Sequence, residues 1–304
     1  MDYVLKTNNL CKYYRNFKAL NGLKMNVPKG SIYGFVGKNG AGKTTLIRLL
    51  CGLQMPTDGD FELYGVKNTD KKISESRSRI GAIVESPSLF PEMTAEENLK
   101  YQYRLLGIPD YKGIPELLEL LGLADTGKTK AGNFSLGMRQ RLGIAIALCG
   151  NQDLLILDEP INGLDPQGII EIRELILKLN HDRNITFIIS SHILDELSRI
   201  ATHYGFIDSG RIVREISAKE LENACRKSLS VNVTDTSALA RVLDSMGLEY
   251  IISDDINAEI FGRPEISELV FALDKEKCRL VSCTEREETL EGFFISLVGG
   301  GSNE

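Results

Sequence analysis

The chain has 304 residues, 42% of them hydrophobic and 26% charged, an ordinary balance for a globular protein with a sizeable core. A net charge of −6 does not favour sequence-independent binding to nucleic acid, and no apolar run reaches the roughly 20 residues of a spanning helix. The N-terminus has no signal-peptide pattern, and the six cysteines form no C-x-x-C pair. We therefore expect a cytoplasmic protein with reduced thiols.

Strand and helix patterns alternate up to about residue 215 and predict an α/β fold. Strands are expected at Ser31–Val36, Phe61–Tyr64, Ile80–Val84, Leu154–Leu157, Ile185–Ser190 and Tyr204–Ile207. Two helical patterns, Ala95–Leu106 and Ile114–Leu123, lie between the third and fourth of these strands. They predict a helical subdomain at about residues 88–150, inserted into the sheet.

The pattern changes near residue 219, and residues 219–304 are expected to form a small α+β accessory domain. Its expected strands are Leu229–Val233, Tyr250–Ile252, Ile256–Phe261 and Arg279–Cys283, and its helices are Ser237–Met246, Ile266–Leu273 and Thr289–Leu297. Leu290, Phe293, Phe294 and Leu297 recur at helical spacing, which predicts that the last helix packs by this face. The tail Gly299–Glu304 is expected to be flexible.

A phosphate-binding loop is predicted at Gly37–Thr44, which matches G-x-x-x-x-G-K-[ST] between a strand and a helical pattern. The expected nucleotide contacts are Gly37, Lys38, Asn39, Gly40, Ala41, Gly42, Lys43, Thr44 and Thr45. Glycines let backbone N–H groups surround phosphates, Lys43 neutralises their charge, and the Thr44 hydroxyl suits Mg²⁺. The spacing does not fit the G-x-G-x-x-G of dinucleotide folds, and the chain has no N-K-x-D guanine motif, which favours ATP.

Two acids, Asp158 and Glu159, follow an apolar strand that should end at the ligand crevice of a parallel sheet. Asp158 is expected to hold Mg²⁺, and Glu159 to polarise the attacking water. The alternative is that two adjacent acids at a strand end face solvent. His192 ends a neighbouring strand and is expected to reach the γ-phosphate, although a lone histidine is more often structural.

The segment Asn133–Arg141, N-F-S-L-G-M-R-Q-R, resembles the L-S-G-G-Q signature motif of ABC (ATP-binding cassette) ATPases. Other motifs of that family stand in the family's order: the Walker A loop, the Walker B acids, the D-loop Gly163–Pro166 and His192 at the switch position. Tyr14 matches the aromatic A-loop position that stacks on adenine. The resemblance covers about residues 3–215 and implies a P-loop NTPase fold with a mixed sheet, in an ATP-binding domain at residues 1–218.

The resemblance implies a mechanism in which two chains enclose two ATP molecules. Ser135 and Gly137 of one chain would contact the γ-phosphate held by the Walker A loop of the other, and the D-loop Asp165 would lie at the same nucleotide. Glu159, His192 and Lys43 would carry catalysis. The implied partners are ATP, a second copy of the chain and integral-membrane permease subunits, with the chain on the inner face of the cell membrane and no nucleic acid.

Two departures from the family pattern point to a subfamily. Leu136 and Met138 replace a Gly and the Gln of the signature, and Glu85 stands at the Q-loop glutamine, where it could still ligate Mg²⁺. Both resemble the bacitracin- and lantibiotic-resistance exporter ATPases, which implies export of a peptide antibiotic or related amphiphile. An ABC ATPase acting on ribosomes or DNA is the alternative, but such proteins usually carry paired cassettes or long coiled coils. A subunit that only senses ATP is disfavoured by the intact catalytic motifs.

Overall fold

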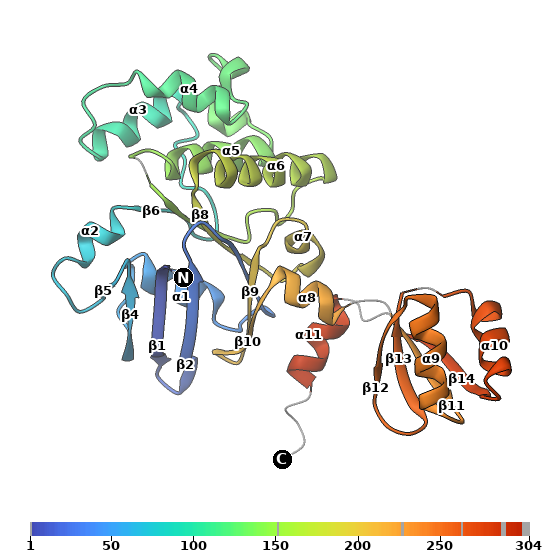
Figure 1. The fold of residues 1–304 in the computed structure, drawn as a ribbon. Helices are drawn as coiled ribbons and strands as arrows, with labels where there is room; N and C mark the ends of the chain where they lie inside the picture. The colour runs from blue at the N-terminus through green and yellow to red at the C-terminus, as the bar shows by residue number, and fades with distance from the viewer. Residues whose placement is uncertain (1, 151, 226–227, 263, 287–289, 300–304) are drawn as a thin grey trace. The chain divides into compact units, whose positions relative to one another are not determined.

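The protein is described here by a computed structural model that divides into two compact units, Met1–Ala218 and Lys219–Glu304 (Figure 1). The described residues are 2–150, 152–225, 228–262, 264–286 and 290–299. Among them, no helix is long and apolar enough to cross a membrane. Apart from Gly299, the tail expected to be flexible lies outside these residues.

A six-stranded sheet forms the centre of the first unit, in the order β10-β9-β3-β8-β7-β6. Its strands are β3 (Ile32–Val36), β6 (Ile80–Ile83), β7 (Leu154–Asp158), β8 (Thr186–Ser191), β9 (His203–Asp208) and β10 (Arg211–Ser217). Five strands run parallel, and only the edge strand β10 is antiparallel to its neighbour. The central strands β3, β7 and β8 are buried at every residue, as in a sheet covered on both faces, and the sequences of β3 and β7 are nearly all apolar.

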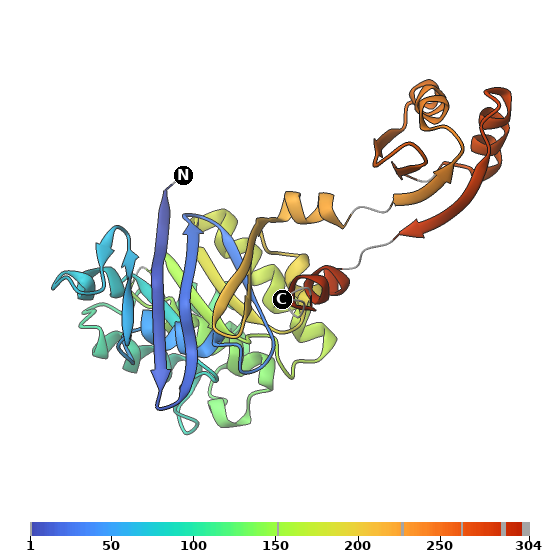
Figure 2. The same ribbon diagram turned by 90° about the horizontal axis from the view of Figure 1, so that it is seen from below.

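A second, antiparallel sheet in the order β2-β1-β4-β5 was only partly predicted. It consists of β1 (Tyr3–Tyr14), β2 (Phe17–Pro28), β4 (Asp58–Leu63) and β5 (Val66–Lys67), and the long β1–β2 hairpin is seen lengthwise in Figure 2. Helix α1 (Lys43–Leu50) shares one apolar core with both sheets. Since Leu46, Ile47, Leu49 and Leu50 are all fully buried, α1 is fixed rigidly directly behind the phosphate-binding loop.

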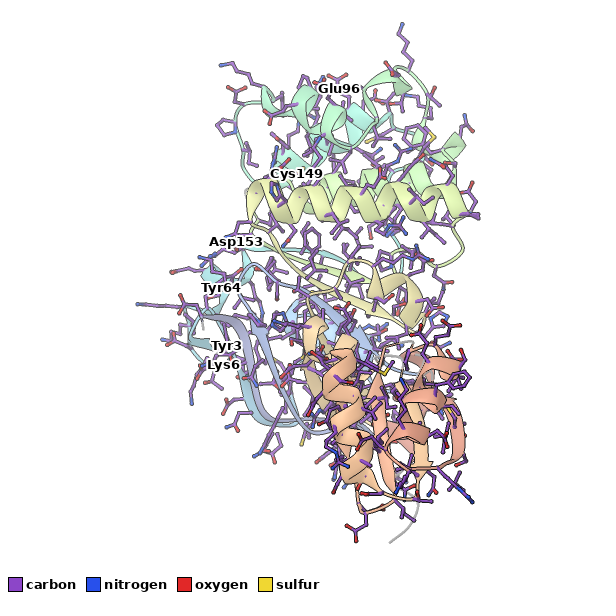
Figure 3. The ribbon with its side chains drawn as sticks, turned by 45° about the vertical axis from the view of Figure 1, so that its right-hand side comes forward. Tyr3, Lys6, Tyr64, Glu96, Cys149 and Asp153 are labelled. Atoms are coloured by element: carbon purple, nitrogen blue, oxygen red, sulfur yellow. The ribbon has the colours of Figure 1, made fainter. Side chains whose placement is uncertain are left out.

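A polar contact joins the two sheets at the edge opposite this loop (Figure 3). Tyr64, just after β4, donates a hydrogen bond of 2.5 Å to Asp153, just before β7. Arg79 pairs with the same carboxylate and stacks over the Tyr64 ring, 3.5 Å from its centroid. The contact ties the antiparallel sheet to the N-terminal ends of the parallel strands.

Helices between β6 and β9 form the rest of the first unit. They are α3 (Ala95–Leu105), α4 (Gly113–Leu120), α5 (Leu136–Ala147), α6 (Pro166–Arg183) and α7 (Leu194–Ser198), with short 3₁₀ turns at Ala124–Thr126 and Ala131–Asn133; α2 (Ile73–Arg77) precedes β6. A capping box between Thr94 and Glu97 begins α3. Asp165 caps α6, which ends at Asn184 in the left-handed conformation.

The second unit is a βαββαβ fold whose sheet has the order β12-β13-β11-β14. Its elements are β11 (Ser228–Val233), α9 (Thr236–Met246), β12 (Glu249–Ile252), β13 (Asn257–Phe261), α10 (Ile266–Lys275) and β14 (Leu280–Arg286), preceded by α8 (Ala218–Ala224) and followed by α11 (Leu290–Gly299). Alternate residues of β11, from Leu229 to Val233, pack with α9 and α10 in a separate core. The strands and helices expected here are confirmed to within a few residues at their ends, except that Thr289, the first residue of the last expected helix, lies outside the described residues.

Three of the six cysteines, Cys11, Cys149 and Cys278, are buried. Burial raises the pKa of the Cys51 thiol to about 11 and that of Cys149 to about 12. Both thiols therefore stay protonated at neutral pH and have low reactivity.

Candidate functional site

Three neighbouring strands bring the predicted motifs to one edge of the central sheet. The phosphate-binding loop follows β3, Asp158 ends β7, and β8, which lies between them, ends at Ser191 just before His192. The carboxyl ends of parallel strands meet at the ligand-binding edge of such sheets. Residues separated by more than a hundred positions in the sequence are therefore in hydrogen-bonding contact here.

Glycines shape the phosphate-binding loop for two different reasons. Gly40 and Gly42 have φ values of 82° and 111°, a region that other residues rarely adopt. Gly37 has no room for a side chain, because a Cβ there would lie 2.5 Å from the carbonyl oxygen of Ile207. The loop ends at the first turn of α1, where free backbone N–H groups favour an anion.

Lys43 lies at the floor of the loop with only 6% of its side chain exposed. Its Nζ donates to the carbonyl oxygen of Gly37 at 2.6 Å and lies 3.2 Å from Glu159 Oε1. A buried cation with these partners offers strong charge stabilisation to a phosphate, which would compete with Glu159 for the ammonium.

Thr44 and Asp158 provide the oxygen atoms expected of a magnesium site. The Thr44 hydroxyl donates to Asp158 Oδ2 at 2.8 Å, and Asp158 is only 3% exposed. Mg²⁺ beside a nucleotide commonly takes one or two protein oxygens, with phosphates and waters completing its shell, so these two residues fit it. The exposed carboxylate of Glu85 pairs with Arg48 on α1 in this structure. Its role as a magnesium ligand stays a prediction.

Glu159 lies between the lysine and the histidine. Its Oε1 faces Lys43, and its Oε2 lies 2.7 Å from His192 Nδ1. Glu159 adopts φ 50°, a left-handed conformation that is strained for a residue with a side chain. The structure thus brings together Lys43, Thr44, Asp158, Glu159 and His192, and it places the last two where a base and its positioning group could act on a water.

A pocket of about 250 Å³ opens beside these residues and is lined by Phe17, Ala19, Asn39, Gly40, Gly42, Lys43, Thr44, Thr45 and Glu159. Phe17, which the sequence motifs do not mark, is 58% exposed at its mouth. It pairs across the β1–β2 hairpin with Tyr14, whose hydroxyl contacts Gln54 and whose ring lies under Lys12. Tyr14 is therefore next to the pocket, and Phe17 supplies an aromatic surface within it.

The signature segment and the D-loop contact each other at a separate part of the surface. Ser135 is the exposed N-cap of α5 and accepts a hydrogen bond from Met138 N at 3.2 Å. A Cβ on Gly163 would lie 3.4 Å from the Leu136 side chain, so the two segments are in contact within one chain. Neither Ser135 nor Gly137 lines the pocket described above, so this chain's own pocket does not use its signature segment.

The amino-acid sequence places the chain in a family. It is 41% identical to the bacitracin transport ATP-binding protein BcrA of Bacillus licheniformis over 305 residues, covering 99% of each protein. The chain belongs to the ABC transporter ATP-binding proteins. The ABC transporter family model matches residues 20–162 of this ABC protein, and BcrA of Enterococcus faecalis is 39% identical over 99% of the chain and 98% of its own length. The lantibiotic transport ATP-binding protein SrtF of Streptococcus pyogenes is 42% identical over 72% of the chain and 93% of its own length.

Solved structures of ABC cassettes share the fold. A dimeric cassette in a post-hydrolysis state, bound to ADP and phosphate, superposes with a TM-score of 0.63 at 25% identity, covering 70% of this chain and 98% of its own. A cassette of the cbiONQ transporter complex of Clostridium perfringens gives a TM-score of 0.66 at 25% identity, covering 81% of this chain and 97% of its own. The P-loop NTPase fold predicted from the sequence is thereby confirmed. This ABC protein is the ATP-binding and ATP-hydrolysing subunit of a transporter.

Proposed function

We propose that this ABC ATPase powers export of a bacitracin-like peptide antibiotic through a separate permease. The supporting observation is the extent of the similarity: two proteins named for bacitracin transport match 99% of the chain, including the βαββαβ unit. The similarity to the lantibiotic transport protein covers 72% of the chain. A bacitracin-like peptide is therefore the favoured cargo.

Hydrolysis begins with ATP held by the loop from Gly37 to Thr45, with Lys43 on its phosphates. The nucleotide's phosphate displaces Glu159 from the lysine, which frees the carboxylate to accept a proton from the attacking water. His192 orients Glu159 through the contact at 2.7 Å. It would also contact the γ-phosphate of the bound nucleotide. Phe17 and Tyr14 stack on the adenine.

Mg²⁺ would be held by Thr44 and Asp158, where it would neutralise charge on the β- and γ-phosphates. The buried carboxylate and the hydroxyl, 2.8 Å apart, support this assignment. Glu85 could join them only after leaving Arg48.

The active form would be a homodimer with two ATP molecules at its interface. Ser135 and Gly137 lie at the first turn of α5, a suitable anion-binding position that this chain's own pocket leaves unused. The D-loop, to which Asp165 belongs, contacts this segment through Gly163 and Leu136. The dimer would sit on the inner face of the cell membrane, bound to permease subunits.

Two experiments test the proposal. The tagged Glu159→Gln protein is purified from detergent-solubilised membranes of cells that produce it, and mass spectrometry should identify a polytopic membrane protein bound to it.

In the second experiment, the gene for the chain is deleted, and growth is measured in bacitracin, a lantibiotic and an unrelated antibiotic. Bacitracin sensitivity should rise, and the wild-type gene, but not Glu159→Gln, should reverse it. Unchanged bacitracin sensitivity would contradict the cargo, and ribosomal or DNA-processing partners alone would contradict transport.

A further inference from the structure

Ser190 occupies the centre of the site although no motif includes it. It is fully buried near the end of β8, directly opposite Asp158 on the neighbouring strand β7. Its hydroxyl donates to Asp158 Oδ1 at 2.5 Å and accepts a hydrogen bond from the backbone N–H of Glu159 at 3.0 Å. One hydroxyl therefore contacts both acids.

The first of these contacts fixes the orientation of the Asp158 carboxylate. Thr44 occupies Oδ2 and Ser190 occupies Oδ1, so both carboxylate oxygens have a partner on a different element of the fold. Asp158 is only 3% exposed, and water has little access to replace a lost partner. When a cation takes the place of the Thr44 hydrogen bond, Ser190 is the group that keeps the carboxylate in position.

The second contact supports the strained backbone of Glu159. A left-handed conformation is unfavourable for a residue with a Cβ, and it persists only where its surroundings impose it. The Glu159 N–H is held by both the hydroxyl and the carbonyl oxygen of Ser190, at 3.0 and 3.2 Å. His192, which follows Ser190 by two residues, contacts the carboxylate of Glu159.

We propose that Ser190 is a positioning residue that orients Asp158 for Mg²⁺ and the Glu159 backbone for catalysis. The proposal rests on the magnesium role proposed above for Thr44 and Asp158. The adjacent Ser191 provides a matched comparison. It is equally buried, but its hydroxyl hydrogen-bonds with the backbone carbonyl and N–H of Ile193, where it closes a local turn.

The test measures binding of the fluorescent ATP analogue mant-ATP to the full chain, first in EDTA and then with increasing Mg²⁺. Wild type is compared with Ser190→Ala, Ser190→Thr and Ser191→Ala, and thermal melting confirms that each variant is folded. In Ser190→Ala, the Mg²⁺ concentration that gives half of the maximal effect on mant-ATP binding should rise about tenfold. This is the lower end of the range expected for the loss of a hydrogen bond to a charged group. Affinity in EDTA should stay within about twofold, because Lys43 and the loop backbone are unchanged.

Ser190→Thr, which keeps the hydroxyl, and Ser191→Ala should both retain the Mg²⁺ dependence of wild type. A folded Ser190→Ala protein with wild-type Mg²⁺ dependence would overturn the proposal. So would an equal loss of affinity in EDTA and in Mg²⁺, because that result describes general damage to the site. If Mg²⁺ has no effect on mant-ATP binding by the wild-type chain, the assignment of Thr44 and Asp158 to Mg²⁺ is itself wrong.

Discussion

The aromatic pair at the mouth of the pocket gives a prediction that the sequence motifs alone do not. Phe17 lines the pocket, and Tyr14 is its partner across the hairpin. Replacing Phe17 by Ala removes the aromatic surface next to the phosphate-binding loop and leaves Lys43 and Thr44 in place. We expect weaker binding of ATP, because the contact with the base is lost while the contacts with the phosphates remain.

The size of the effect follows from the free energy of stacking. Phe17 is 58% exposed without nucleotide, so it has an aromatic face available to a base. Stacking of a base on an aromatic side chain contributes about 1–3 kcal/mol, which corresponds to a Kd for ATP about 5- to 150-fold higher in Phe17→Ala. Tyr14→Ala should also raise the Kd, and because the two residues are neighbours, their effects should not simply add.

The assay is calorimetric titration of the purified chain and its variants with ATP and, as a control, with inorganic tripolyphosphate. Tripolyphosphate has no base, so its affinity should be the same for wild type, Phe17→Ala and Tyr14→Ala. An unchanged Kd for ATP in Phe17→Ala would refute the stacking role of Phe17. Equal losses for ATP and tripolyphosphate would refute the reasoning as well, because they would place the damage in the phosphate site.

Two further substitutions test the surroundings of the site. Glu85→Gln breaks an exposed ion pair with Arg48 and should change the free energy of unfolding by no more than about 0.5 kcal/mol in urea titrations, so a larger loss would show that the pair stabilises the fold. Ser135→Ala removes the cap of α5 and should lower the free energy of unfolding by about 1 kcal/mol while leaving ATP binding to the single chain unchanged. Weakened binding by a monomeric Ser135→Ala protein would place the signature serine in its own chain's pocket.

Strong local signals made much of the fold predictable. The buried strands β3 and β7 are apolar at nearly every position, and β8 has an apolar run at its centre. The predicted ranges of all three agree with the structure to within one residue at each end. Strand β1 was missed because its register shifts at several points against β2, which replaces the alternation of buried and exposed residues with pairs of each. Helix α6 was also missed, although its signals are present: the cap Asp165, the following proline, and apolar residues at helical spacing.

The site residues that belong to a recognisable sequence motif were predictable. The loop from Gly37, the acids Asp158 and Glu159, and His192 come together as their strand ends require. Phe17 could not be found in this way, because only the hairpin pairing brings it to the pocket. Ser190 had a weak signal: it stands two residues before His192 in a strand, and such residues share a face of the sheet.

The measurement that tests the mechanism most directly is phosphate release and light scattering with Glu159→Gln. Losing the base should slow phosphate release about 100-fold or more, while ATP still binds because the neutral amide leaves Lys43 free for phosphate. With ATP and Mg²⁺, the variant should scatter as a species of twice the 33.7 kDa mass of the chain, and Lys43→Ala should not. Phosphate release at the wild-type rate, or a variant that stays monomeric in saturating ATP, would contradict the roles proposed for Glu159 and for the ATP-bound dimer.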